Sequence, residues 1–234
     1  MKLKTLLILS VLACFFFTCG NNQAEKEQQV TINKEVTDFD YNVDTFADVK
    51  VLRYQVPGWE NLTLKEQKLV YYLTQAGLAG RDIVYDQNYR YNLKIRNALE
   101  NVYTNYNGDK NSEDWKAFET YLKRIWFSNG IHHHYSNDKI KPDFNSDYLK
   151  QLLDETNTIL EGEAFDVVFN DEDIKKVNQG KGIDNVALSA VNFYGPNVTN
   201  DDVFSFYAKL KTPNPDKPLS FGLNSQLVKE NGVL

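Results

Sequence analysis

The chain has 234 residues, of which 42% are hydrophobic, 13% aromatic and 25% charged, an ordinary composition for a globular protein. Its formal net charge of -6, with no basic stripe, argues against a nucleic-acid partner, because phosphate binding depends on clustered Lys and Arg. Both cysteines, Cys14 and Cys19, lie near the N-terminus, so the body that follows cannot form an internal disulfide.

The first residues have the pattern of a lipoprotein signal peptide. Lysines precede an apolar run over residues 6–17, which is far shorter than the ~20 residues of a membrane-spanning helix. The run ends at the letters TCGNN over residues 18–22, which resemble a bacterial lipobox followed by a polar tether. We expect residues 1–18 to be the signal peptide and Cys19 to carry lipid. Lipidation of Cys14 and an ordinary cleaved signal are the alternatives.

The segment after the signal is predicted to be a flexible tether over residues 19–36. It consists of Gln, Asn, Glu and Lys with hardly an apolar residue, too few to bury anything. We therefore expect an exported protein that a lipid anchor holds to a membrane of a bacterial cell envelope, on its periplasmic or surface face. Residues 37–234 are the expected folded body.

The body is predicted to begin with a strand over residues 47–56, where apolar and polar residues alternate. Val49 and Val51 are expected to point inward, with Tyr54 and Val56 as further inward candidates. The dipeptide Pro-Gly that follows ends the strand.

Five helices are predicted from apolar residues at helical spacing and from residues that can cap a helix. The first covers residues 64–78, where Thr63 and Glu66 have the spacing of a capping box. The others run over about residues 89–105, to about 127 from Ser112, to about 159 from Ser146, and to about 210 from Thr199. Ser112 and Ser146 are predicted to cap their helices, and Thr199 and Asp202 again place a hydroxyl and a carboxylate three residues apart.

The buried faces of these helices follow from the same spacing. On the first helix they are Leu69, Val70, Leu73 and Ala76; on the second, Ile95, Leu99 and Val102; on the third, Trp115, Phe118, Leu122 and Ile125; on the fourth, Tyr148, Leu149, Leu152, Leu153 and Ile159; on the fifth, Val203, Phe206, Tyr207 and Leu210. An aromatic stripe at helical spacing favours packing over ligand stacking, so Trp115, Phe118 and Trp126 are assigned to the core.

The end of the sequence has the pattern of an unfinished hairpin. A strand is predicted over residues 220–228, and Asn231 and Gly232 form the dipeptide most typical of a two-residue hairpin turn. The return strand then has two residues, too few to pair. We expect the natural protein to continue; a frayed tail is the alternative.

Two runs of sequence resemble the dipeptidyl peptidase III family. Residues 126–139, WFSNGIHHHYSNDK, resemble a loop in which Ser-Asn-x-Gly leads into an aromatic and then Asp and Lys; bacterial members often carry the triple histidine. Residues 192–202, NFYGPNVTNDD, look like the family's Tyr-Phe-x-Gly-x-x-Thr stretch. Residues 64–80 look like its early helix, so the resemblance covers most of residues 45–234.

The resemblance implies a zinc exopeptidase that removes dipeptides from the N-terminus of short peptides, built as two lobes around a wide cleft. Its zinc helix carries His-Glu-x-x-x-His, with a further Glu as third ligand. The chain has no His-Glu pair, so we expect this motif beyond residue 234 and the fragment alone to be inactive. The expected fold class is α+β, mainly helical with a mixed sheet, as the incomplete N-terminal part of the lower lobe.

The resemblance also implies that the loop at residues 129–137 lines a substrate subsite. Asn129, His134 and Tyr135 are the predicted substrate-binding residues, and no catalytic residue is expected in the chain. Adjacent side chains project in different directions, so three neighbouring histidines do not make a metal site. Zinc is expected in the full-length protein and none in this fragment. The competing hypothesis is a non-catalytic surface lipoprotein that binds peptide or another ligand.

Overall fold

The computed structural model describes residues 39–172, 174–210 and 225–234. The chain divides between Asp40 and Tyr41, and the fold below is that of Tyr41–Leu234. The predicted signal peptide, Cys19, the tether and residues 220–224 of the last predicted strand lie outside the described residues. Within the described part of the chain, no helix combines the length and the apolar character needed to cross a bilayer.

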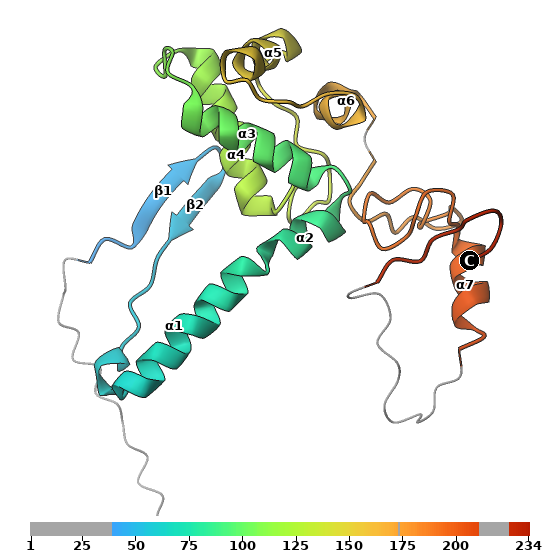
Figure 1. Ribbon diagram of the computed structural model, residues 1–234, viewed down its shortest axis with the longest axis horizontal. Helices are drawn as coiled ribbons and strands as arrows, with labels where there is room; N and C mark the ends of the chain where they lie inside the picture. The colour runs from blue at the N-terminus through green and yellow to red at the C-terminus, as the bar shows by residue number, and fades with distance from the viewer. Residues whose placement is uncertain (1–38, 173, 211–224) are drawn as a thin grey trace, which may run out of the picture. The chain divides into compact units, whose positions relative to one another are not determined.

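Helices dominate this unit, and one small sheet accompanies them (Figure 1), so the coarse α+β class is confirmed. The helices are α1 (Leu64–Ala79), α2 (Arg81–Asn88), α3 (Asn92–Asn105), α4 (Glu113–Ser128), α5 (Ser146–Glu155), α6 (Glu163–Phe169) and α7 (Asn200–Tyr207), with a short 3-10 turn at Trp59–Asn61. The sheet of the described residues is antiparallel, where a mixed sheet was expected.

The sheet is a hairpin of β1 (Asn42–Phe46) and β2 (Val49–Leu52). The predicted strand at 47–56 is therefore correct only in its middle: residues 47–48 form the turn, and the strand ends at Leu52. Val49 and Val51 are half-buried, but Tyr54 and Val56 are 74% and 68% exposed, so their predicted inward position is wrong. Pairing with β1, which was not predicted, decides where β2 begins and ends.

Helix ends follow local capping chemistry. Thr63 and Glu66 form the predicted capping box of α1, Thr199 and Asp202 form that of α7, and Ser112 accepts a hydrogen bond from the Trp115 backbone N–H at 3.2 Å. These predictions are confirmed.

The predicted cap of α5 is wrong by one residue. Asn145, which has an extended backbone, accepts a hydrogen bond from the Tyr148 N–H at 2.8 Å, and Ser146 is the first helical residue. The helix also ends earlier than expected, at Glu155, and Ile159 beyond it is 82% exposed. Ser and Asn are both good caps, and the backbone conformation selects between them.

Replacing Asn145 by Ala is expected to lower the free energy of unfolding by about 1 kcal/mol, because a helix N–H loses its acceptor. Ser146→Ala is the matched control and should change it by less than about 0.5 kcal/mol. Urea denaturation of both variants makes the comparison. A larger loss for Ser146→Ala would restore the cap that the sequence indicated.

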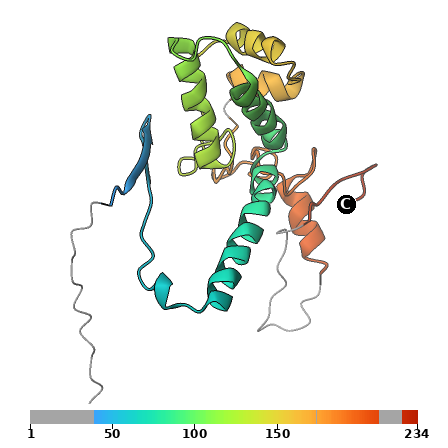
Figure 2. The same ribbon diagram turned by 60° about the vertical axis from the view of Figure 1, so that its left-hand side comes forward.

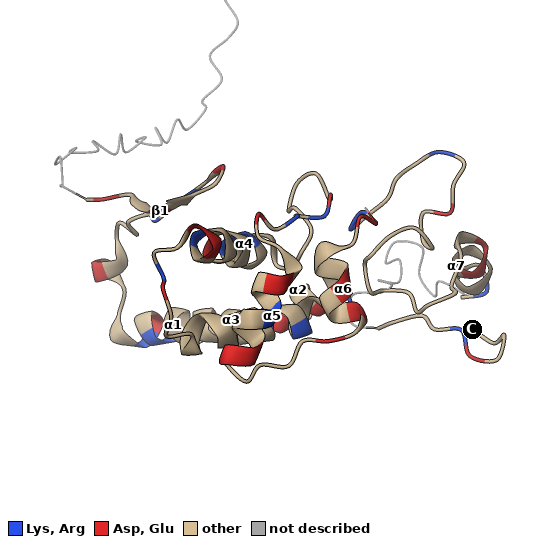
Figure 3. Cartoon of the chain, turned by 90° about the horizontal axis from the view of Figure 1, so that it is seen from above, with Lys and Arg blue, Asp and Glu red and all other residues tan. Residues whose placement is uncertain are grey.

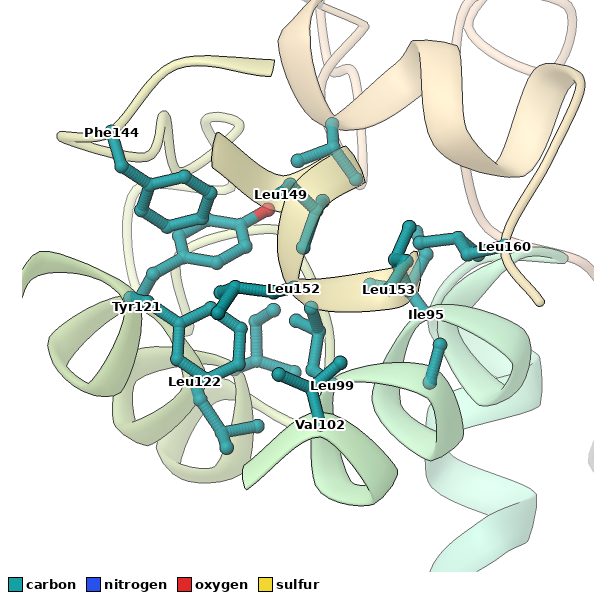
Figure 4. Packing of buried hydrophobic residues seen from close by; sticks show 14 of the residues in the cluster. Ile95, Leu99, Val102, Tyr121, Leu122, Phe144, Leu149, Leu152, Leu153 and Leu160 are labelled. Atoms are coloured by element: carbon teal, nitrogen blue, oxygen red, sulfur yellow. The ribbon is translucent and has the colours of Figure 1, made fainter. Parts of the chain in front are cut away.

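The core lies where α3, α4, α5 and α6 meet (Figures 2 and 4). The predicted apolar face of α4 is fully confirmed, and the packing assignment of Trp126 is confirmed by its partly buried position against the same cluster. The labelled side chains of Figure 4 come from α3, α4, α5 and the residues beside them. Buried residues of this core that were predicted are Ile95, Leu99, Val102, Trp115, Phe118, Leu122, Ile125, Leu149, Leu152 and Leu153.

The first helix does not have the buried face that its sequence predicts. No residue of α1 is buried, and Leu69, Val70 and Leu73 are all exposed. The helix carries no charged residue after Lys68, and Figure 3 shows it mostly without charge beyond its first turn. Residues 69–73 are consecutive and apolar, so they cover every side of the helix instead of one stripe.

The C-terminal turn forms as predicted. Asn231 and Gly232 both have positive φ, 50° and 79°, and Glu230 and Val233 exchange two backbone hydrogen bonds of 2.9 Å. This is the two-residue hairpin turn that Asn-Gly favours. Of the strand predicted over 220–228, the described part makes one parallel bridge, from Leu227 to Tyr194.

Candidate functional site

The candidate site is the loop over residues 129–141, which follows α4. Asn129 ends the helix in the left-handed conformation, with φ 53° and ψ 47°, and Gly130 continues with φ 139°. The Gly130 N–H donates to the carbonyl of Ile125 at 3.0 Å, so the last turn of α4 is closed and the chain reverses sharply. Asn is among the few residues that adopt this conformation readily, and Gly is the other.

The base of the loop is held by Asn92, a fully buried residue at the start of α3. Its side-chain amide donates to the carbonyl of Tyr85 at 3.0 Å, and its amide oxygen accepts from the Ile131 N–H at 3.1 Å. Gly130 lies directly against it: a Cβ there would be 2.1 Å from Nδ2 of Asn92. One side chain therefore joins α2, α3 and the loop.

Above this base the loop is a narrow hairpin. Ile131 accepts from the Ile140 N–H at 2.8 Å, and His132 and Lys139 form an antiparallel bridge. The His133 N–H then donates to the carbonyl of Asp138 at 2.7 Å. Residues 133–138 are thereby left as the tip, on a base that belongs to the core.

The three histidines have three different environments. His132 is buried, donates from Nε2 to the carbonyl of Ile174 at 2.9 Å and meets the Tyr89 ring edge to face at 5.3 Å. His133 is half-buried, and His134 is exposed with its ring edge to face on Phe127 at 4.8 Å. Across the part of the chain that the structure describes, no group of three or more His, Cys, Asp or Glu is arranged to hold a metal ion.

Two of the predicted binding residues lie together at the tip. Tyr135 is 87% exposed, and its ring centroid is 6.0 Å from that of His134. Asn129 is directed elsewhere: its side-chain oxygen accepts from Arg81 at 3.2 Å, and its carbonyl accepts from the Asn88 side chain at 3.0 Å. The hydrogen bonds of Asn129 therefore fix the loop to α2, while His134 and Tyr135 form its exposed surface.

Charged side chains surround a surface cavity of about 420 Å³ beside the tip. Lys175 binds the Asp138 carboxylate at 2.9 Å and, together with Ser136, lowers the pKa of Asp138. Partial burial lowers the pKa of His134, and the neighbouring His133 and Lys176 lower it further. The cavity is lined by Arg124, His133, Ser136, Asp138, Lys139, Ile140 and Lys141.

A second cavity, of about 520 Å³, involves the other run that carries the resemblance. Asn192 and Phe193 line it together with Asp82 and Asp86 of α2, and the Gln226 amide donates to the Asn192 side chain at 2.7 Å. Gln226 was not singled out from the sequence, because only the fold brings it beside Asn192.

Both places offer hydrogen-bond donors, acceptors and aromatic faces, which are the groups that hold a ligand. In comparisons with known proteins, no family model matches the chain and no curated protein is significantly similar to it. The family that residues 126–139 and 192–202 resemble stays a prediction.

Proposed function

We propose that residues 37–234 are the N-terminal, substrate-binding part of a zinc-dependent dipeptidyl peptidase of the dipeptidyl peptidase III type. Such an enzyme removes dipeptides from the N-terminus of short peptides. The observation that carries the proposal is the loop at 129–141, which overlaps the run at 126–139 that resembles that family and presents His134 and Tyr135 from a base anchored in the core. A fixed base with an exposed aromatic tip suits a peptide subsite.

In this proposal the chain binds and another part of the protein performs the chemistry. The three histidines of the chain are those of the loop, and their rings point to different partners. Zinc, when bound in the full-length protein, would activate the attacking water. Its ligands would come from a His-Glu-x-x-x-His helix beyond residue 234, and this chain would orient the peptide.

The exposed apolar surface of helix α1 supports the proposal that this chain is part of a larger protein. A helix that is apolar all round is normally buried, and large exposed apolar patches mark contacts with other polypeptide. Leu69, Tyr72 and Leu73 are each more than half exposed on α1. Further polypeptide that encloses α1 would complete its burial, as expected for one part of a lobe.

We further propose that the protein is exported and anchored by lipid at Cys19 in a bacterial cell envelope. The support is the order of the sequence: an apolar run, a cysteine preceded by a small residue, and a polar tether. Short peptides outside the cytoplasm would then be the substrates.

The sequence of the gene beyond codon 234 tests the function directly. A His-Glu-x-x-x-His stretch followed by a downstream Glu is the expected result. A stop codon at position 235 would contradict the enzyme and favour a non-catalytic lipoprotein that binds peptide or another ligand.

Tyr135→Ala and His134→Ala are expected to raise the Michaelis constant of the full-length enzyme roughly five- to tenfold with little change in turnover. A contact made equally in the ground and transition states contributes to affinity alone. Steady-state kinetics on a dipeptidyl reporter substrate gives both constants. Tyr54→Ala, at another exposed tyrosine, is the control and should behave as wild type. A thousandfold loss of turnover at constant Michaelis constant would instead place the residues in the catalytic machinery.

A further inference from the structure

The tip of the loop is held by one ring nitrogen of His133. Its Nδ1 accepts a hydrogen bond from the Tyr135 N–H at 3.2 Å and a second from the Ser136 N–H at 3.1 Å. These two bonds close the turn that carries Tyr135. The main chain of His133 is fixed as well, since its N–H donates to the carbonyl of Asp138 and its carbonyl accepts from the Asn137 N–H.

The two bonds require an unprotonated Nδ1. An imidazole nitrogen accepts only through its lone pair, and in the imidazolium ion both nitrogens are donors. Protonation would set an N–H of the ring against two backbone N–H groups, so both hydrogen bonds would be lost at once.

The groups that face His133 come from several segments. Arg124 of α4, Lys139, Lys141 and Asp138 line the same cavity, and the ring of His134 lies 4.4 Å away between centroids. Arg124 is bound to Asp48 at 3.0 Å, Lys141 to Asp171 at 2.9 Å, and Asp138 to Lys175 at 2.9 Å. The Asp138 carboxylate is held by Lys175, and the charge of a protonated His133 would also interact favourably with it. Acidification would nevertheless remove both hydrogen bonds that the ring accepts from the backbone.

We infer that His133 is a positioning residue: its unprotonated ring builds the turn that presents Tyr135, and protonation of the ring releases that turn. The part of this inference that concerns substrate rests on the proposed function. The part that concerns the turn rests on the geometry of residues 133–136 alone.

The first test follows the Tyr135 and Ser136 amides of the chain by NMR between about pH 8 and about pH 5. In the wild type, we expect protection of these amides from hydrogen exchange, corrected for intrinsic rates, to fall roughly tenfold on acidification. His133→Asn keeps an acceptor oxygen near the position of Nδ1 but does not titrate, so its protection should stay constant. His133→Leu lacks the acceptor and should be unprotected throughout.

Two results would overturn the inference. One is a wild-type protection of Tyr135 and Ser136 that does not change with pH. The other is a His133→Asn variant as unprotected as His133→Leu. His134→Leu is the matched control, because it removes the neighbouring imidazole and leaves the acceptor, so the two amides should behave as in the wild type.

The second test measures the Michaelis constant of the full-length enzyme for a dipeptidyl substrate. His133→Leu is expected to raise it about fivefold at neutral pH with turnover retained, and His133→Asn to restore it. If the NMR result is as expected and both variants keep the wild-type Michaelis constant, the role of His133 in forming the turn is supported. The role of Tyr135 in substrate binding is then contradicted. Failure of the proposed function is therefore distinguishable from failure of the positioning role.

Discussion

Gly130→Ala is expected to destabilise the chain by roughly 3–5 kcal/mol. An added Cβ would lie 2.1 Å from Nδ2, 2.5 Å from Cγ and 2.7 Å from Oδ1 of Asn92, so this buried side chain must move. Moving it breaks the hydrogen bonds to Tyr85 and Ile131 and leaves buried backbone groups unsatisfied. The φ of 139° adds backbone strain for any residue with a side chain. Urea denaturation gives the free energy of unfolding.

Two other glycines separate these effects. Gly182 has a φ of 74° with open space around it, so Gly182→Ala should show the conformational cost alone, about 1–2 kcal/mol. Gly77 lies inside α1 with nothing near, and Gly77→Ala should stabilise the helix by up to about 1 kcal/mol. If Gly130→Ala costs no more than Gly182→Ala, the contact with Asn92 is not what fixes the base of the loop.

Features that depend on one turn of chain were predictable. The capping boxes at Thr63 and Thr199 involve partners three residues away, and the hydroxyl of Ser112 meets the N–H of Trp115 at the same spacing. The Asn231-Gly232 turn is equally local, because both residues tolerate positive φ. In each case the atoms that determine the local structure belong to residues close together in the chain. The local sequence is therefore enough to predict it.

Features that depend on a distant partner were not predictable. The strand expected over residues 47–56 is cut at both ends by its hairpin with β1, which weak alternation did not reveal. The helix expected over residues 89–105 begins only at Asn92, as α3, and the helix before it, α2, was not predicted. Tertiary context overrides the local pattern in both places.

The site shows the same division. Its exposed tip, His134 and Tyr135, was predicted from the run of residues 126–139. Its anchor was missed, because Asn92 lies 39 residues before Ile131 and an Asn in a helix gives no sign of burial. The sequence also does not show which of the three histidines is buried. The ring of His132 is buried where it bonds to Ile174 and packs against Tyr89, and both partners are distant in the sequence. Sequence therefore located the loop, and the fold explains how it is held.

Asn92→Asp tests this anchor with an almost isosteric change. The carboxylate cannot donate to the Tyr85 carbonyl, and burial of its charge is unfavourable. We therefore expect the free energy of unfolding to fall below that of the wild type by roughly 3–5 kcal/mol near neutral pH, and we call this difference the deficit. Burial raises the pKa of such a carboxyl in the folded state above its unfolded value of about 3.9. The unfolded chain then releases its proton first as the pH rises. The deficit relative to wild type is therefore smallest below about pH 4 and grows until the folded pKa is passed.

Urea denaturation of wild type and variant at about pH 4 and about pH 7 measures this difference. The control is Asn92→Ala, which removes both hydrogen bonds without adding a titratable group, so its deficit should be about the same at the two values. An Asn92→Asp deficit that stays constant with pH would mean that water reaches the carboxylate. The loop at 129–141 would then rest on a solvated contact, and its tip would not be presented from a rigid base.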